Sequence, residues 1–258
     1  MLIDYAVRAT DNKGEKLPKT SLREALLISK GAGFITTSYL PSCLIYGLVA
    51  YLRVQEKLLQ ELIDNDFSDD MRLTVPLLSI SSVSNDAEAT ICSMKLTVQF
   101  TDRLVYLDRF IKETQRRHNP SFQPSRTAKI DLILPDGYKL SKYSVIIPAL
   151  HHIHNNFVLW DNPAKFDPDR WATPEVKNRR EATYIPFATG SRMCIGFNFS
   201  LREVRIFLPK LVHRYKFLKD GDDTIEYDPI FQLIRPNNLY VRSERWAKHP
   251  PKMEMEQL

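Results

Sequence analysis

The stretch Phe187-Ala-Thr-Gly190-Ser-Arg192-Met-Cys194-Ile-Gly196 carries the strongest signal in this chain, and a helical pattern follows it directly. A loop that ends at a helix N-terminus offers free backbone N–H groups and the positive end of the helix dipole. Both favour a thiolate over a thiol, so Cys194 is placed as a metal ligand would be. The glycines allow a flat cofactor to approach the backbone, and Arg192 can pair with a carboxylate at its edge. The alternative for a lone cysteine is a buried, unreactive thiol.

The composition narrows the class of protein. The 258 residues are 43% hydrophobic, which is enough for one sizeable core or two small ones. The net charge is +5, with 36 basic and 31 acidic residues interspersed. This pattern predicts a solvated surface rather than a nucleic-acid-binding one. Cys43, Cys92 and Cys194 have no paired spacing, which argues against a disulfide framework and for a reducing compartment.

Targeting signals are not evident in the pattern. Residues 1–20 have no basic segment followed by an apolar run, so we expect no signal peptide. The longest apolar stretch, from Phe34 to Leu52, has about the length of a membrane span but contains several polar residues and Pro41. We therefore expect a long buried core helix there, with no membrane span and no anchor in this chain.

The first half of the chain predicts one long helix. It covers residues 20–62, begins at a capping box formed by Ser21-Leu-Arg-Glu24, and is kinked at Pro41. Residues 72–98 have neither a helical nor a strand period, and we expect an irregular insert there.

The second half predicts shorter elements. A helix over 106–117 is stopped by His118-Asn-Pro120, and short strands follow near 129–134 and 144–147. A helix behind Gly196 runs to about residue 215, and terminal strands fall within 227–241. The chain therefore predicts a mainly α protein with small β-sheets, an α+β fold class.

Two charged motifs precede the cysteine loop. Glu113-Thr-Gln-Arg116 places both charges on one helix face, and Phe166-Asp-Pro168-Asp-Arg170-Trp171 adds a second arginine in a rigid loop. Taken alone, the first motif is most often a solvated surface pair. In this order and spacing, however, the three motifs resemble the haem-thiolate signature of cytochromes P450. The resemblance implies that Glu113, Arg116 and Arg170 form a structural triad behind the haem loop.

The resemblance also implies a domain organisation. Residues 1–258 would form a single partial cytochrome P450 domain, the C-terminal half of that fold. Within it, residues 20–62 would be the distal helix and 72–98 the irregular insert. Residues 104–246 would run from the E-x-x-R helix to the haem-binding loop and the C-terminal strands.

The cofactor implied by the resemblance is haem b, with the Cys194 thiolate as the axial ligand of the iron. Arg192 matches an arginine that pairs with a haem carboxylate, and Arg126 resembles a strand arginine with the same role. Phe187 matches an aromatic residue that packs near the sulfur. Gly196 completes the loop motif as a cofactor-binding position.

A further resemblance lies upstream, in Gly31-Ala32-Gly33-Phe34-Ile35-Thr36-Thr37. It is similar to the family's oxygen-binding helix, and Thr36 falls at the position of the catalytic alcohol. The family has an acid where this chain has Ile35, which cannot donate a proton, so proton delivery would depend on Thr36 and water or be impaired. The alternative for this stretch alone is a buried helix with small residues.

The resemblance implies a monooxygenase. One oxygen atom would enter a small organic substrate, and electrons would come from NADPH through NADPH-cytochrome P450 reductase. The style of the motifs suggests fungal secondary metabolism. With no anchor or signal peptide expected in this chain, we expect a cytoplasmic location or a peripheral one at the endoplasmic reticulum. Because the chain starts just before the distal helix, we expect a truncated product with exposed apolar surface. Two alternatives stay open: a catalytically inactive P450 remnant, and a non-enzymatic haem-binding protein.

Overall fold

The computed structural model describes residues 18–68, 100–121, 124–221 and 238–253, together with the short pieces 7–8, 10, 13–16, 226–228 and 235–236. Within these residues the protein is mainly helical with small two-stranded antiparallel sheets, which confirms the expected fold class. The insert expected at residues 72–98, which includes Cys92, lies outside the described residues.

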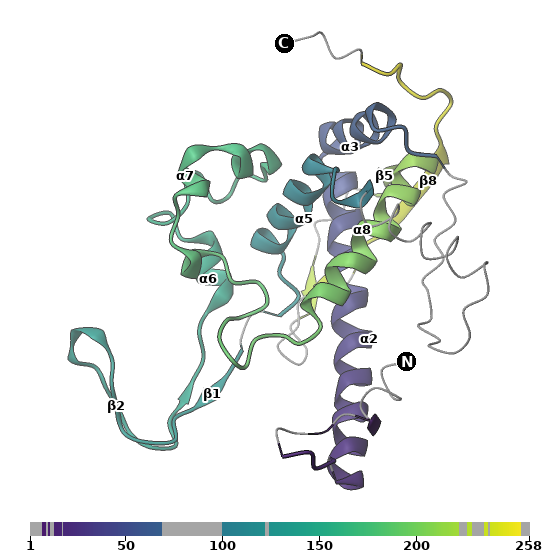
Figure 1. Ribbon diagram of the computed structural model, residues 1–258. Helices are drawn as coiled ribbons and strands as arrows, with labels where there is room; N and C mark the ends of the chain where they lie inside the picture. Colours follow the sequence, from purple (N-terminus) through teal and green to yellow (C-terminus); the bar gives the residue numbers. More distant parts are fainter. Residues whose placement is uncertain are drawn as a thin grey trace.

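The longest element is helix α2 (Lys19–Ala50), which runs as a long column through Figure 1. The expectation of one helix over 20–62 is wrong, because the chain leaves the helix at Tyr51 (φ −130°, ψ 77°) and resumes as α3 (Leu52–Asp64). The Tyr51 ring stacks on Phe166, with ring centroids 4.4 Å apart, so a tertiary contact accompanies the break. α2 continues through Pro41, since one missing N–H is a local loss.

The capping box expected at Ser21 is also wrong. α2 begins at Lys19 with Pro18 at the N-cap position, and no side chain caps it. Ser21 therefore lies inside the first turn, where a capping role has no geometric basis. Proline fixes its own φ near the helical value, which suits it to the start of a helix.

The core lies where α3, α5 (Val105–Arg117) and α8 (Phe197–Arg214) meet the C-terminal half of α2. Gly47 of α2 shows how closely these helices approach. A Cβ atom added there would lie 2.9 Å from the Phe110 ring of α5, too close for any larger residue without movement. The buried apolar side chains of this core include Leu44, Leu48, Leu58, Leu62, Leu107, Phe110, Val204 and Leu208.

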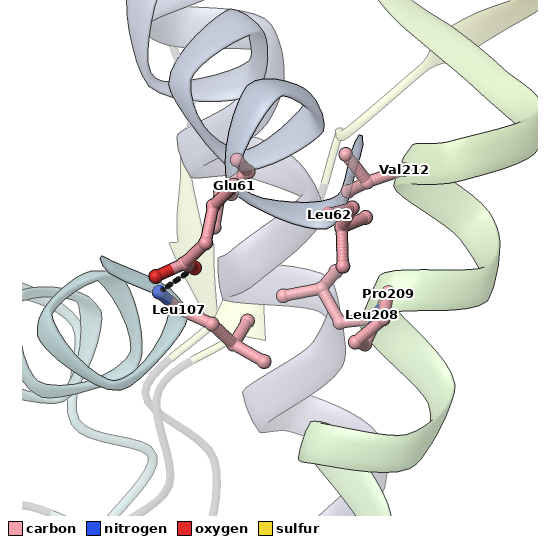
Figure 2. A pocket seen from close by; sticks show the side chains of 7 residues that line it. Glu61, Leu62, Leu107, Leu208, Pro209 and Val212 are labelled. Carbon is pink, nitrogen blue, oxygen red and sulfur yellow. Dashed lines mark hydrogen bonds between the residues drawn. The ribbon is translucent and has the colours of Figure 1, made fainter. Parts of the chain in front are cut away.

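Helix α5 is capped by a side chain from another helix. It has Leu104 at its N-cap position and no capping side chain of its own. Instead the Glu61 carboxylate of α3 accepts hydrogen bonds from the backbone N–H groups of Tyr106 and Leu107, the latter at 2.9 Å (Figure 2). Burial raises the pKa of Glu61, against the lowering effect of the two amide bonds. Glu61 thereby fixes the start of α5 against α3.

The apolar junction beside Glu61 is closely packed. Figure 2 shows the side chains that line a cavity there. Its volume is only about 10 Å³, the space of one water molecule at most. The cavity is lined by Leu58, Glu61, Leu62, Leu107, Leu208, Pro209 and Val212. α3, α5 and α8 are therefore held in one arrangement.

Replacing Glu61 with alanine is expected to lower the free energy of unfolding by roughly 2 kcal/mol. The reason is the loss of a cap and the exposure of two partly buried N–H groups to an environment without an acceptor. Urea-induced unfolding measures this change. Glu56→Ala, an exposed carboxylate on the same helix, is the matched control and is expected to change stability by less than about 0.5 kcal/mol. Equal effects of the two substitutions would show that the cap contributes nothing.

Short helical elements connect α5 to α8. They support the loops around the candidate site rather than the main core. They are α6 (Leu150–Asn155), η2 (Pro168–Ala172), α7 (Pro174–Lys177) and η3 (Glu181–Thr183).

The strands form four antiparallel pairs among the described residues. The strands expected near 129–134 and 144–147 are present in shorter form, and β6 and β7 fall within the expected terminal strands at 227–241, whereas β8 begins only at residue 241. The pairs are β1 (Arg126–Thr127) with β4 (Val145–Ile146), β2 (Leu132–Ile133) with β3 (Lys139–Leu140), β5 (Tyr215–Lys219) with β8 (Val241–Arg245), and β6 (Tyr227–Asp228) with β7 (Arg235–Pro236).

Two segments away from the cysteine loop expose apolar side chains. One is the N-terminal half of α2, where Phe34 is 78% exposed. The other is the arm formed by β1 to β4, which extends away from the helical body in Figure 1 and on which Ile133 is 74% exposed. The exposed apolar surface expected from the sequence is therefore confirmed. α2 is also long and apolar enough to cross a membrane by length and composition, as core helices of soluble proteins can be.

Candidate functional site

The carboxylate of Glu113, on α5, is the centre of a hydrogen-bond network and is fully buried. It accepts five hydrogen bonds. Arg116 donates two, from Nε at 3.0 Å and Nη2 at 2.8 Å, and Arg170 donates one from Nε at 3.1 Å. The backbone N–H of Asp167 and the indole N–H of Trp171 each donate one at 3.0 Å. The helical spacing places Glu113 and Arg116 on one face of α5, and that face is buried in the protein. The alternative of a solvated surface pair is therefore wrong.

The two arginines also hold the loop over residues 161–165. Arg116 donates to the carbonyl oxygen of Pro163, and both arginines donate to that of Lys165. Arg170 donates further to the carbonyls of Asp161 and Asn162. Burial lowers the pKa of Arg116, although the ion pair with Glu113 acts in the opposite direction and raises it. The structure therefore brings the three residues of the expected triad together and adds two donors, Trp171 and the Asp167 amide, that sequence reasoning missed.

The cysteine loop is closed by its own backbone. The N–H of Cys194 donates to the carbonyl oxygen of Phe187 at 3.0 Å, and that of Met193 to Gly190 at 3.0 Å. Gly190 has φ +79°, which glycine adopts freely, and Ala188 has φ +58°, a conformation that costs a residue with a Cβ about 1 kcal/mol. The turn is therefore tight and locally strained.

Cys194 has an exposed, free thiol, which rules out the alternative of a buried, unreactive one. It lies three residues before the start of α8, with Gly196 as the N-cap residue. Cys43 is the contrast: it is buried in α2, and burial raises the pKa of its thiol to about 12. Of the two described cysteines, Cys194 alone is placed to bind a ligand.

Arg126 and Arg192 meet at the cysteine loop. Arg126, on strand β1, donates from Nη2 to the backbone carbonyl oxygen of Arg192 at 2.8 Å. Both side chains are exposed. Two exposed arginines thus lie on adjoining segments, one of them in the cysteine loop, and guanidinium groups suit a ligand with two carboxylates.

Phe187 and Gly196 lie at the two ends of the loop. The Phe187 ring is 6.2 Å from that of Phe197, the first residue of α8. A Cβ atom at Gly196 would lie 3.9 Å from the Cys194 sulfur, an ordinary contact distance. Gly196 therefore keeps space open beside the sulfur without being required by the loop itself.

Thr36 lies on α2, half-buried, and its hydroxyl donates to the carbonyl oxygen of Ala32 at 2.6 Å. Its recorded hydrogen bond is thus within the helix, and the structure shows none from Thr36 to the cysteine loop. Ile35 is 39% exposed, and added Cβ atoms at Gly31 and Gly33 would meet open space. The alternative of a buried stretch of small residues is wrong for this part of α2.

The residues present fit a haem. A flat apolar macrocycle with two carboxylates needs a sulfur ligand, apolar contacts and cations. The thiol of Cys194 is exposed among exposed apolar side chains: Ile195 is 96% and Phe199 70% exposed. Arg126 and Arg192 supply the cations.

Comparisons with known proteins show the family of this chain. The family model described as Cytochrome P450 matches residues 1–241. The cytochrome P450 monooxygenase alnD of Emericella nidulans is 45% identical over 96% of the chain and 41% of its own length. Rat cytochrome P450 4F5 is 26% identical over 94% of the chain and 42% of its own length.

Solved structures share the fold. A cyanobacterial cytochrome P450 with retinoic acid bound has a TM-score of 0.78 at 20% identity, over 95% of this chain and 50% of that one. The heme domain of cytochrome P450DA has a TM-score of 0.75 at 23% identity, over 97% of this chain and 51% of that one.

The structure combines a helical body, a cysteine loop with an exposed thiol, and a buried carboxylate that binds two guanidinium groups. The chain belongs to the cytochrome P450 family. Members of this family bind haem through a cysteine thiolate. The chain spans about 41% of the length of the curated relatives it matches.

Two buried histidines make stability depend on pH. Burial lowers the pKa of His118 to about 3 and that of His154 to about 4, from 6.5. Each histidine is neutral in the folded protein but takes up a proton in the unfolded chain below pH 6.5. The stability that each contributes is therefore complete above pH 6.5 and is lost as the pH falls towards its folded pKa.

We therefore expect acidification from about pH 7.5 to about pH 5 to lower the free energy of unfolding by about 2 kcal/mol for each of these histidines. Urea-induced unfolding at the two pH values measures it. His154→Gln is expected to remove about half of the pH dependence, and the exposed control His152→Gln to leave it unchanged. An equal pH dependence in the wild type and His154→Gln would contradict the assignment.

Proposed function

We propose that this chain is the haem-binding part of a cytochrome P450 monooxygenase, with Cys194 as the axial ligand of haem b. The observation that carries the proposal is the exposed Cys194 thiol in a backbone-closed loop, three residues before a helix. The loop ends at the N-terminus of α8, and Arg126 binds the backbone of the loop at Arg192. The bound haem supplies oxygen activation, which lets one oxygen atom enter a small organic substrate.

The chain's own residues bind and orient. Arg192 and Arg126 pair with the two carboxylates of the cofactor and fix its rotation. Phe187 packs near the sulfur, and Gly196 leaves room beside it. Glu113, with its two arginines, has a structural role, since Glu113 and Arg116 are fully buried and Arg170 is mostly buried.

Thr36 is the proposed group for proton delivery. Its hydroxyl proton is engaged with Ala32, so its oxygen acts first as an acceptor for a water molecule. Ile35 next to it is unable to donate, so proton transfer depends on that water. Electrons come from NADPH through NADPH-cytochrome P450 reductase.

The similarity to a fungal monooxygenase supports a fungal enzyme, and we assign its substrate to secondary metabolism. We place it in the cytoplasm or peripherally at the endoplasmic reticulum, where the reductase is available. Ile35 favours a second candidate, a haem-binding protein without turnover, because it removes a proton donor.

One measurement tests the proposal. The chain, supplied with haem and reduced under carbon monoxide, is expected to give a strongly red-shifted Soret band. If the chain took up no haem, the proposal would be wrong and the chain would be an inactive remnant. A red-shifted band without NADPH-dependent substrate oxidation in the presence of the reductase would favour the second candidate.

A further inference from the structure

Three buried polar side chains each bind one residue of the segment that leads into the cysteine loop, Tyr184-Ile185-Pro186. The Tyr184 hydroxyl donates to the Gln115 amide oxygen at 3.0 Å. The N–H of Ile185 donates to Nε2 of His154 at 3.1 Å. The side-chain amide of Asn119 donates to the carbonyl oxygen of Pro186 at 3.1 Å.

The three side chains come from outside the segment and are almost fully buried. Gln115 is 3%, His154 0% and Asn119 5% exposed. Gln115 is on α5, Asn119 lies two residues beyond its end, and His154 is on α6. A buried polar group without its partner costs about 1–3 kcal/mol, so these bonds favour one position of the segment over displaced ones.

We propose that Gln115, His154 and Asn119 are positioning residues that set where the chain enters the cysteine loop and so where the Cys194 sulfur lies. This rests on the proposed function, in which that sulfur binds the haem iron. The segment is followed directly by Phe187, whose carbonyl oxygen accepts the N–H of Cys194 at 3.0 Å. A shift of Ile185 is therefore passed directly to the cysteine.

His154 joins this arrangement to the buried Glu113 network. Arg116 donates from Nη1 to the backbone carbonyl oxygen of His154 at 2.9 Å, while the imidazole of the same residue accepts the Ile185 N–H. α5, α6 and the entry segment are thus connected through one residue. A metal ligand has to be held within about 0.5 Å, which needs such a support.

Within the part of the chain that the structure describes, the imidazole of His154 also has an unpaired buried nitrogen, which lowers the stability of the fold. Its presence therefore indicates a positioning role rather than a stabilising one. Because Nε2 accepts, the proton is on Nδ1, and Nδ1 has no hydrogen-bond partner among the described residues. Leucine at this place would lose the bond to Ile185 but would also remove the unpaired N–H. His154→Leu should therefore change the position of the segment more than the stability of the fold.

The test compares His154→Leu and Asn119→Asp with the wild type. Asn119→Asp keeps the shape of the side chain but removes the donor to Pro186. His152→Leu, an exposed position on the same helix, is the matched control, and His154→Gln is the rescue, since its amide oxygen can accept the Ile185 N–H.

The first readout is backbone amide hydrogen exchange in the full chain without haem. Both test variants are expected to raise the exchange of Ile185 and Cys194 about tenfold or more, while the amides of α3 exchange as in the wild type. The rescue and control variants should match the wild type. Unchanged exchange at Ile185 and Cys194 would overturn the proposal, and so would an equal rise in α3, because that is general destabilisation.

The second readout is the reduced, carbon-monoxide-bound spectrum of the haem-loaded chain. The two test variants are expected to lose most of the red-shifted Soret band, and His154→Gln to regain it. If the wild type itself lacks that band, the proposed function fails, and the exchange result alone decides on positioning. A full red-shifted band in both test variants would overturn the proposal.

Discussion

Glu113→Gln is expected to lower the free energy of unfolding by about 3–5 kcal/mol, a large fraction of the stability of an ordinary domain. The substitution keeps the shape of the side chain but removes its charge. Arg116, which is 0% exposed, then becomes a buried cation without a counter-ion. The new amide N–H₂ also faces groups that can only donate, among them the indole of Trp171.

Urea-induced unfolding of the full chain measures the change. Glu203→Gln on the exposed face of α8 is the matched control, with an expected change below about 0.5 kcal/mol. Haem uptake should fall together with stability, because the loops behind the cysteine lose their support. A loss below about 1 kcal/mol would mean that Glu113 is not the centre of the network.

The parts of this site that the sequence predicts are those set by local spacing. Three residues along a helix place Glu113 and Arg116 on one face, so their contact follows from the chain itself. The turn into α8 and the end of α5 at His118 are also local, and both are found where expected. The contact of Arg170 with Glu113 was predicted only from the resemblance of its loop to the family motif, because 57 residues separate the two.

Contacts across long sequence distances explain most of what was missed. Trp171, Gln115 and His154 look like ordinary core residues in the sequence, and their partners lie 58, 69 and 31 residues away. Glu61 reads as one more carboxylate on an amphipathic helix, yet it caps α5.

The errors at the long helix have the same origin. Local rules favour Ser21 as a cap, but α2 begins at Lys19 without a side-chain cap, and the helix continues on both sides of Pro41. The break falls at Tyr51, an ordinary helix residue by propensity, where the ring stacks on Phe166 from the loop before η2. Tertiary packing here decides the helix boundary over local preference.

Cys194→Ala is expected to abolish the red-shifted Soret band of the reduced, carbon-monoxide-bound chain completely. No other described cysteine can replace it, because Cys43 is buried and burial raises its thiol pKa to about 12. The effect is confined to the ligand, since the backbone bond from residue 194 to Phe187 needs no side chain. The exposed position also means that removing the sulfur leaves no cavity, so stability should change by less than about 0.5 kcal/mol.

This difference separates ligand loss from unfolding. Cys43→Ala makes a cavity in α2, so it is expected to lower stability by about 1 kcal/mol while keeping the red-shifted band. The two variants thus have opposite profiles: one loses the spectrum and keeps its stability, and the other does the reverse. A red-shifted band that persists in Cys194→Ala would remove the thiolate from the site and, with it, the reason for the rigid support that Glu113 and His154 provide beneath the loop.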